Sequence, residues 1–345
     1  MLRHFIHAAL LISLSFSSYA DVIQFKESPN TEHVVVKGDT LWDISAKFLK
    51  DPWLWPAVWN GNAYIKNPHL IYPGDVIRIC LVEGEQRLCV NGADSDDGKW
   101  QPRMRLSDFE QEAIAMIPLS DIRPFLMYPL VLTEEQLANS PYIVHLEGQR
   151  LIAEKGTKLY ARSIKNNYYE NYISFRPGNT YTDPETEEIL GHEAIYLGTN
   201  KLLIAGDPAT LKIIESVSEV KKGDRVMPRI LEEEVEDFFP FAPKKPLHAQ
   251  IISVFKDHQT ISQYDVVVLN KGLDDDFKKG HILSVLKVGQ VIHDPYAEDK
   301  DEQVKLPDEM IGTVMVFRSF KRVSYALVMS ATNTISLLDK VQTPE

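Results

Sequence analysis

The chain has 345 residues, of which 44% are hydrophobic and 25% are charged, as in an ordinary globular protein. Its formal net charge of −12 repels phosphate backbones and anionic lipid headgroups, which argues against nucleic acid and membrane surfaces as partners. The length is sufficient for two or three domains.

The N-terminal segment has the pattern of a secretory signal peptide. Arg3 and His4 precede a short apolar run, and a small-residue cleavage motif ends at Ala20. The run is too short to span a bilayer, and no later segment is continuously apolar over the required length. The sequence therefore predicts that residues 1–20 are removed and that the mature protein is exported without membrane insertion.

Residues 33–80 begin with a strand followed by a helix. Residues 33–37 are rich in β-branched side chains, which favours a strand. Asp39 is the expected N-cap of the helix, because its carboxylate can accept backbone N–H groups of the first turn. The predicted apolar face of this helix consists of Leu41, Ile44 and Phe48.

The second half of this segment is predicted to contain a second helix and a second strand. Asp51-Pro52 predicts the start of a second short helix, which carries Trp55 and Trp59 four residues apart. A turn at Pro73-Gly74-Asp75 leads into a strand at residues 76–79. The predicted order is therefore strand, helix, helix, strand.

The chain contains two cysteines, Cys80 and Cys89, on either side of a predicted turn at Glu83-Gly84-Glu85. In an oxidising compartment this spacing favours a hairpin tied by a disulfide, with two reduced thiols as the alternative. A metal site is not expected, because no further nitrogen or sulfur ligands lie nearby.

Residues 91–100 are polar and glycine-rich, as in a linker. Two capping-box patterns follow, Ser107-x-x-Glu110 and Thr133-x-x-Gln136, each of which predicts the start of a short helix. Residues 91–140 are therefore expected to be a linker with short helices. From about Tyr142 onward, short apolar runs separated by Gly, Pro and Asp indicate β structure.

The β-rich half contains matching segments that indicate a duplication. Chance similarity between turns is the alternative. An acidic and then proline-rich stretch at 231–246 separates the copies, which predicts β domains at 141–230 and 247–345. The matched pairs are 142–148 with 266–272, 155–156 with 279–280, 178–184 with 289–295, 189–191 with 310–312, and 224–226 with 339–341.

Two motifs give residues 33–80 a family resemblance. Val36-Lys37-Gly38-Asp39-Thr40-Leu41-Trp42-Asp43-Ile44 opens the segment, and Asn67-Pro68-His69-Leu70-Ile71-Tyr72-Pro73-Gly74-Asp75 closes it. Together they resemble a LysM module, a carbohydrate-binding domain that recognises N-acetylglucosamine in peptidoglycan and chitin. With its flanks, the expected LysM domain covers residues 31–90. The middle of the segment is richer in Trp than is usual in that family.

The resemblance implies a shallow groove between two facing loops, where backbone N–H and C=O groups satisfy the acetamido group of the sugar. Helix capping is the alternative role for Asp39, and the helix core is the alternative for Leu41. Trp42 and Trp53 are possible groove edges, whereas Trp55 and Trp59 are expected in the core. The implied glycan-binding residues are Gly38, Asp39, Thr40, Leu41, His69, Leu70, Ile71 and Tyr72.

No catalytic site is expected. Cysteine-peptidase chemistry needs a reactive thiol, and zinc-peptidase chemistry needs a histidine cluster. Gly191-His192-Glu193 lacks the second histidine of a zinc motif and is interpreted as a turn at a strand edge. The acidic runs at 232–237 and 274–276 are typical of solvated segments rather than of paired glycosidase carboxylates or calcium loops.

The whole chain resembles exported proteobacterial LysM-domain proteins with a β-rich C-terminal half, and its β part resembles small docking modules of envelope assemblies. The expected fold class is α+β: a βααβ LysM module, a helical linker and two related small, mostly-β domains. The predicted function is non-catalytic peptidoglycan binding in the periplasm, without cofactor or metal, with the β domains as a scaffold for an envelope protein or for self-association. The alternatives are an assembly protein whose LysM fold binds protein, and a cell-wall hydrolase.

Overall fold

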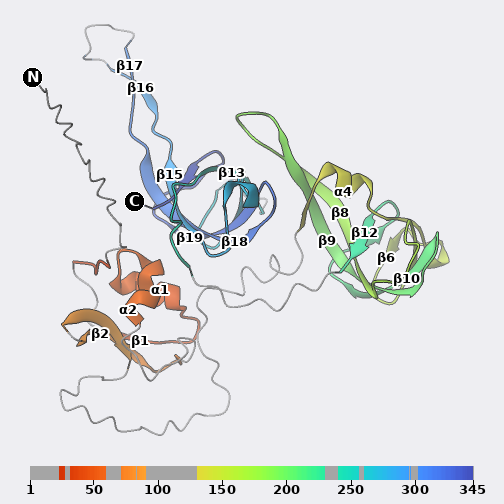
Figure 1. The fold of residues 1–345 in the computed structure, drawn as a ribbon, viewed down its shortest axis with the longest axis horizontal. Helices are drawn as coiled ribbons and strands as arrows, with labels where there is room; N and C mark the ends of the chain where they lie inside the picture. The colour runs from red at the N-terminus through yellow and green to blue at the C-terminus, as the bar shows by residue number, and fades with distance from the viewer. Residues whose placement is uncertain are drawn as a thin grey trace, which may run out of the picture. The chain divides into compact units, whose positions relative to one another are not determined.

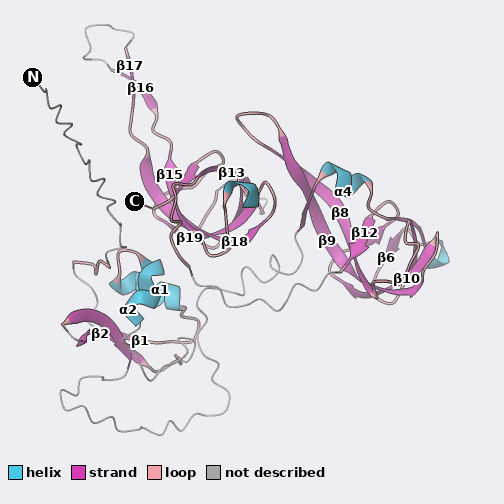
Figure 2. Ribbon diagram, viewed as in Figure 1, coloured by secondary structure: helices cyan, strands magenta, loops and turns pink. Residues whose placement is uncertain are grey.

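The computed structural model describes residues 23–27, 32–59, 71–82, 84–90, 130–229, 240–255, 260–294, 296 and 302–344. The chain divides into two compact units, Met1–Ile114 and Ala115–Glu345. Strands dominate the described residues (Figure 2). The predicted signal peptide, most of the predicted helical linker and most of the acidic linker lie outside the described residues.

The first unit has the predicted order of strand, helix, helix and strand, followed by one more strand (Figure 1). Its sheet is antiparallel, with the order β1-β2-β3. The elements are β1 (Glu32–Val34), α1 (Leu41–Phe48), the 3₁₀ turn η1 (Pro52–Leu54), α2 (Trp55–Trp59), β2 (Val76–Val82) and β3 (Glu85–Val90).

The helices of this unit cover a compact core. The predicted apolar face of α1 is confirmed, because Leu41, Ile44 and Phe48 are all at most 2% exposed. Trp55 is also in the core, as predicted, at 1% exposure. Asp51 precedes η1 as expected, although its side chain makes no capping hydrogen bond.

The predicted N-cap of α1 is wrong by one residue. Thr40, not Asp39, is the N-cap, and its Oγ1 accepts a hydrogen bond from the backbone N–H of Asp43 at 3.1 Å. Thr40 Oγ1 also donates to the Asp43 carboxylate at 2.7 Å. Both residue types cap helices well, and here Asp39 is held by the preceding turn, which leaves Thr40 for the helix.

The predicted disulfide is confirmed. Cys80 on β2 is bonded to Cys89 on β3, with the two Cα atoms 6.0 Å apart. The two strands pair from Ile77 with Val90 to Val82 with Glu85, so the bond ties the hairpin of β2 and β3. The covalent link therefore fixes the third strand to the sheet of the first unit.

The second unit begins with β4 (Leu130–Leu132) and α4 (Glu134–Ala138), and the predicted capping box of Thr133 and Gln136 is present at the start of α4. Six strands then close into a ring, because β9 pairs with β10 in addition to the sheet order β10-β7-β5-β12-β8-β9-β4. We call this the first ring. Its strands are β5 (Tyr142–Leu146), β7 (Lys158–Arg162), β8 (Asn171–Thr182), β9 (Ile189–Ile204), β10 (Ala209–Ser216) and β12 (Arg225–Pro228).

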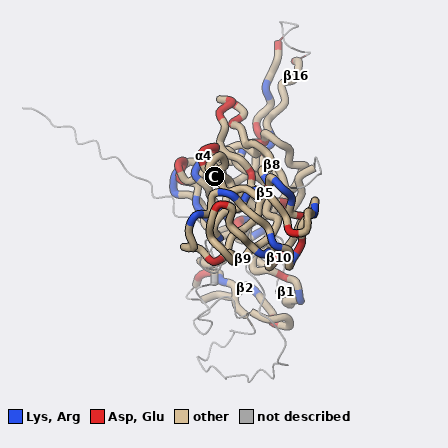
Figure 3. Tube along the Cα trace, turned by 90° about the vertical axis from the view of Figure 1, so that its right-hand side faces the viewer, with Lys and Arg blue, Asp and Glu red and all other residues tan. Residues whose placement is uncertain are grey.

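Minor elements flank the first ring. They are η2 (Glu147–Gln149) and the paired short strands β6 (Ile152–Ala153) and β11 (Val220–Lys221). Charged side chains of both signs are interspersed along this unit (Figure 3). None of the helices in the described part of the chain combines the length and apolarity needed to cross a bilayer.

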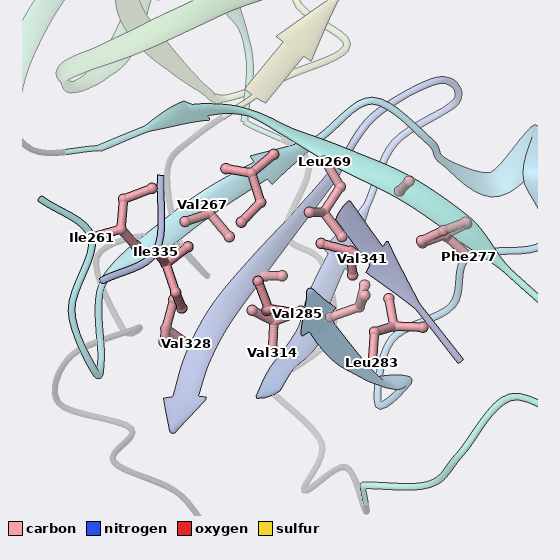
Figure 4. Packing of buried hydrophobic residues seen from close by; sticks show 14 of the residues in the cluster. Ile261, Val267, Leu269, Phe277, Leu283, Val285, Val314, Val328, Ile335 and Val341 are labelled. Carbon is pink, nitrogen blue, oxygen red and sulfur yellow. The ribbon is translucent and has the colours of Figure 1, made fainter. Parts of the chain in front are cut away.

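The rest of the second unit is a closed barrel of six strands in the order β13-β14-β19-β18-β15-β20, which we call the second ring. Valine, leucine and isoleucine side chains from these strands fill its interior (Figure 4). The hairpin of β16 (Val291–His293) and β17 (Gln303–Lys305) extends from it, and η3 (Leu273–Asp275) follows β14. The ring strands are β13 (His248–Val254), β14 (Val266–Leu269), β15 (Ile282–Lys287), β18 (Glu309–Ser319), β19 (Ser324–Ala331) and β20 (Lys340–Gln342).

The two rings have the same strand order when β5 is matched with β13. The N–H of Ile143 donates to the carbonyl of Asp224 at 2.8 Å, and the N–H of Ile251 donates to that of Asp339 at 3.1 Å. The sequence matches of 142–148 with 266–272 and of 155–156 with 279–280 are therefore wrong in register, because β5 corresponds to β13 and β7 to β14. The predicted domain boundaries remain predictions.

Candidate functional site

Two connectors lie side by side in the first unit. The first connector, residues 35–40, joins β1 to α1, and the second connector, residues 71–75, leads into β2. The N–H of Val35 donates to the carbonyl of Asp75 at 2.8 Å, and the N–H of Gly74 donates to the carbonyl of Val35 at 2.8 Å. Val35 therefore holds two segments that are far apart in sequence against each other.

Each connector contains the same four-residue turn. The N–H of Asp39 donates to the carbonyl of Val36 at 3.1 Å, while its carboxylate accepts the N–H of Val36 at 2.9 Å. Asp75 makes the same two bonds to Tyr72, at 3.1 and 3.0 Å. The third residue has a positive φ, 99° at Gly38 and 94° at Gly74, which is the conformation that a type II turn requires of glycine.

This turn is not confined to the candidate site. The carboxylates of Asp224, Asp265 and Asp339 each accept the N–H of the residue three positions earlier, at 2.6, 2.8 and 2.8 Å. A turn closed by an aspartate is therefore a general device of this chain, with Gly223, Tyr264 or Leu338 as the residue of positive φ before the aspartate. The Gly-Asp pair at residues 38–39 is set apart by the helix that follows it and by the second connector beside it.

Asp39 has an internal role in its turn. His33 Nε2 lies 2.7 Å from its carboxylate, and Lys47 Nζ lies 3.2 Å from the His33 ring nitrogens. Burial acts to raise the pKa of Asp39, but the hydrogen bonds from Val36 and His33 and the positive charge of Lys47 outweigh it, and the pKa lies below its usual value. The Asp39 side chain is only 13% exposed, so these partners occupy most of it.

Several of the predicted contact residues are buried. Thr40 is 4% exposed, and its hydroxyl is occupied by the helix start, while Leu41 and Ile71 are 2% and 0% exposed. Their side chains belong to the core, so they can contribute to a surface site only through the main chain. Tyr72 is half-buried, and His69 and Leu70 lie outside the described residues.

The predicted groove edge of Trp42 and Trp53 is wrong. These side chains are 2% and 7% exposed, and their rings stack on each other with centroids 6.5 Å apart. They form part of the core between α1 and η1 because a small unit fills its interior with few bulky rings. Nothing is described of the Trp59 side chain.

Exposed apolar side chains near the connectors were not foreseen. Val36 is 54% exposed at the start of the first turn, next to the exposed residues Lys37 and Gly38. Val34 is 51% exposed, whereas Val35 between them is 1% exposed. The three consecutive valines of the sequence do not reveal which of them face solvent, since either register of the strand is compatible with that run.

The Gly191-His192-Glu193 segment, which resembles part of a zinc motif, lies in a strand. Gly191, His192 and Glu193 lie inside β9, opposite β4, so the prediction of a strand-edge turn is wrong. His192 Nδ1 lies 3.1 Å from the Thr180 hydroxyl on the neighbouring strand. Among the described residues, no group of three or more His, Cys, Asp or Glu side chains is arranged to hold a metal ion.

The comparisons with known proteins concern the first unit. The LysM domain model matches residues 33–79. An uncharacterized protein of Bacillus subtilis (strain 168), YqbP, is 39% identical over 64 residues, which are 16% of this chain and 29% of YqbP. The match thus spans less than a third of that relative's length. The matched residues contain both connectors, and the chain is therefore a LysM domain-containing protein with the domain at residues 33–79.

Proposed function

We propose that the LysM domain binds N-acetylglucosamine-containing glycan of peptidoglycan without cleaving it. LysM domains are generally peptidoglycan- or chitin-binding modules, and residues 33–79 match this family. The observation that carries the proposal is the pairing of the two connectors through Val35, with bonds of 2.8 Å to Gly74 and Asp75. This pairing gives two adjacent turns, each fixed by its own aspartate, on one edge of the domain.

The chemistry of an N-acetyl sugar fits such a surface. Its acetamido group offers one N–H donor, one carbonyl acceptor and a methyl group. Main-chain groups in turns that are already fixed lose little conformational entropy on binding, so they provide polar contacts at low cost. In this proposal the main chain of residues 38–41 and 69–72 contacts the amide, and the exposed side chain of Val36 contacts the methyl group.

A periplasmic location follows from the same proposal. The disulfide between Cys80 and Cys89 is of the kind that persists in oxidising compartments, and the predicted signal peptide would deliver the chain there. A single shallow site holds a sugar weakly, so retention on the cell wall needs several sites acting together. The β-rich second unit then serves as the docking or scaffold part of the protein.

Co-sedimentation of the mature protein with insoluble sacculi tests this function. The wild type is expected in the pellet, and Val36→Asp is expected to lose about tenfold or more in affinity because it places a charge against the acetyl methyl group. Leu81→Asp is the matched control, since Leu81 is an exposed apolar residue of the same unit, 74% exposed on β2. Val36→Asp and Leu81→Asp should both retain the wild-type tryptophan fluorescence.

Two readouts oppose the proposal. Recovery of the wild type in the supernatant would exclude glycan binding and would favour a LysM fold that contacts protein. Release of soluble muropeptides or glycan fragments during a long incubation would identify a hydrolase instead. Retention of the protein with no released fragment is the expected result.

A further inference from the structure

Each ring of the second unit extends one hairpin beyond its wall. The first arm is the tip of the β8–β9 hairpin, residues 180–192, and the second arm is the β16–β17 hairpin with its flanks, of which residues 288–294, 296 and 302–306 are described (Figure 1). In the first arm the N–H of Asp183 donates to the carbonyl of Glu188 at 2.9 Å. In the second arm the N–H of Asp294 donates to the carbonyl of Glu302 at 3.0 Å. The two arms therefore occupy the same place in the two rings.

The tips of the arms also share a side-chain bond. Asp183 Oδ1 accepts the N–H of Glu185 at 2.9 Å, and Asp294 Oδ1 accepts the N–H of Tyr296 at 2.9 Å. Each carboxylate thus closes a local turn around a following residue. This second agreement fixes the correspondence of the tips residue by residue.

The first arm is docked on the second ring. Asn270 Nδ2 donates to the Asp183 carboxylate at 3.1 Å, and the Arg322 guanidinium donates to both oxygens of Glu188 at 2.6 and 2.8 Å. Tyr181 is 3% exposed and close to Tyr325, and burial raises the pKa of both phenols. The contact therefore combines one buried aromatic residue with two acidic residues.

The second arm also has one apolar residue and two acidic residues at these positions, but its strands are exposed. Counting from the matched tips, Ile292 corresponds to Tyr181, Asp294 to Asp183, and Glu302 to Glu188. Every residue of β16 and β17 is exposed, and Ile292 is 41% exposed. Val291, Val304, Leu306 and Tyr296 are further exposed apolar side chains of this arm, at 59%, 39%, 41% and 95%. A ribbon with so much apolar surface is typical of an interaction site.

The first ring has the face that such an arm would contact. In the second ring, the docked face joins the segment after β14 to the β18–β19 turn, where the N–H of Leu273 donates to the carbonyl of Phe320 at 2.8 Å. In the first ring, the segment after β7 also meets the β9–β10 turn, although here the turn is the donor, with the N–H of Gly206 donating to the carbonyl of Ile164 at 2.9 Å. In both rings, therefore, these two segments lie against each other at the corresponding place.

The composition of this face matches the second arm. Leu203 and Ile204 are 44% and 65% exposed beside the β9–β10 turn. Arg162 is 47% exposed at the end of β7 and is ion-paired with Asp207 of the β9–β10 turn, while the neighbouring Lys165 is also exposed. Apolar side chains beside a net positive charge suit an arm that carries apolar side chains flanked by carboxylates.

We propose that the second arm docks on the first ring of a second copy of this chain, as the first arm docks on the second ring within one chain. The contact joins two different surfaces, so it is heterologous and adds copies head to tail. It does not depend on glycan binding. Where both occur, the assembly places several LysM domains along one wall surface.

Complementation between two arm and face variants tests the proposal. Sedimentation velocity of the mature wild type is expected to show association that increases with protein concentration. Ile292→Asp places a charge in the apolar surface of the second arm, and Ile204→Asp does the same on the face of the first ring. Each variant alone should therefore associate at least about tenfold more weakly. An equimolar mixture should form one-to-one dimers and nothing larger, because it retains one intact arm and one intact face.

A third surface variant, Leu151→Asp, is the control for this experiment. Leu151→Asp changes an apolar residue that is 83% exposed outside both surfaces, and it should associate like the wild type. Circular dichroism checks that all variants are folded. A wild type that stays monomeric up to its solubility limit, or a mixture that does not dimerise while the wild type associates, would overturn the proposal. The assay contains no glycan, so its failure leaves the sacculus result unaffected.

Discussion

Asp224 and Asp339 occupy the same position in the two rings. Each carboxylate accepts the N–H of the residue three positions earlier, Lys221 at 2.6 Å and Ser336 at 2.8 Å. Each aspartate also follows a residue in the left-handed region, Gly223 at φ 90° in one case and Leu338 at φ 69° in the other. Both rings therefore have the same turn, although only the first ring has a glycine at its left-handed position.

The glycine at this turn is expected to matter only through its backbone conformation. A Cβ at Gly223 would meet no atom within 4 Å, so Gly223→Ala adds no clash. We expect Gly223→Ala to lower the free energy of unfolding of the second unit by about 1 kcal/mol, which is the cost of a left-handed residue with a side chain. Leu338→Gly should not lower it by this amount, because it relieves the same cost. Thermal unfolding followed by circular dichroism measures both, and an unchanged Gly223→Ala would contradict the conformational explanation.

Asp39→Asn is expected to destabilise the LysM domain at neutral pH by roughly 1–3 kcal/mol, since it removes a charged hydrogen-bond acceptor from His33 and Val36. The folded-state pKa of Asp39 lies below its usual value, so its contribution is present above the unfolded-state pKa near 4. It is lost as the pH falls through the lower folded-state pKa. The difference between variant and wild type should therefore shrink in acid.

Urea unfolding followed by tryptophan fluorescence measures this effect within the full chain. Four of the five tryptophans, Trp42, Trp53, Trp55 and Trp59, lie inside the LysM domain. Glu85→Gln is the control, because Glu85 is a carboxylate in the same unit that is 69% exposed, and surface changes of this kind stay within about 0.5 kcal/mol. A difference that persists unchanged at acidic pH would show that Asp39 acts by packing alone.

Removal of the disulfide is expected to weaken the first unit selectively. Cys80 and Cys89 are nine positions apart, and closing so short a loop restricts the unfolded chain by about 2–3 kcal/mol. The variant Cys80→Ser with Cys89→Ser should therefore unfold at lower urea concentration by tryptophan fluorescence. A reducing agent should shift the wild type in the same direction and leave the double variant unchanged, and a shift of the double variant would point to another target of the reductant.

Tyr181→Ala is expected to release the first arm from the second ring. The side chain is 3% exposed, and truncating a buried aromatic residue costs about 3 kcal/mol or more. Limited proteolysis should then cut more rapidly between residues 183 and 188, as mass spectrometry of the fragments would record. Ile195→Ala, at a 44% exposed position on β9, is the control, and equal cleavage of the two variants would argue against a docked arm.

Local chemistry allowed much of the LysM domain to be predicted from its sequence. The spacing of Leu41, Ile44 and Phe48 and the Pro52 at a helix start are short-range signals, and the structure follows them. The N-cap was misplaced because Asp39 and Thr40 are adjacent residues that both cap helices well. Only the hydrogen bonds to Val36 and His33 assign Asp39 to the turn, and these depend on how the strand and helix pack.

The candidate site was harder to predict because exposure depends on packing. A tryptophan is as suitable for a sugar face as for a core, and the stacking of Trp42 on Trp53 decides in favour of the core. The register of the duplication was missed for a related reason. The turn before β7 has a glycine, Gly156, at its positive-φ position, whereas the corresponding turn before β14 has Tyr264 there. Gly156 was therefore matched with the next available glycine, Gly280, which precedes β15.

One strand links an arm to its ring wall without interruption. β9 runs from Ile189 at the arm to Ile204 beside the β9–β10 turn, and it pairs with β8 along most of this length. A pull applied at the tip draws β8 and β9 together, so it loads in shear the rows of hydrogen bonds that β9 makes with β10 and that β8 makes with β12. The bonds of such a row must fail together rather than one after another. Mechanical load between neighbouring modules would be carried by the backbone of this strand rather than by the side chains of a hinge.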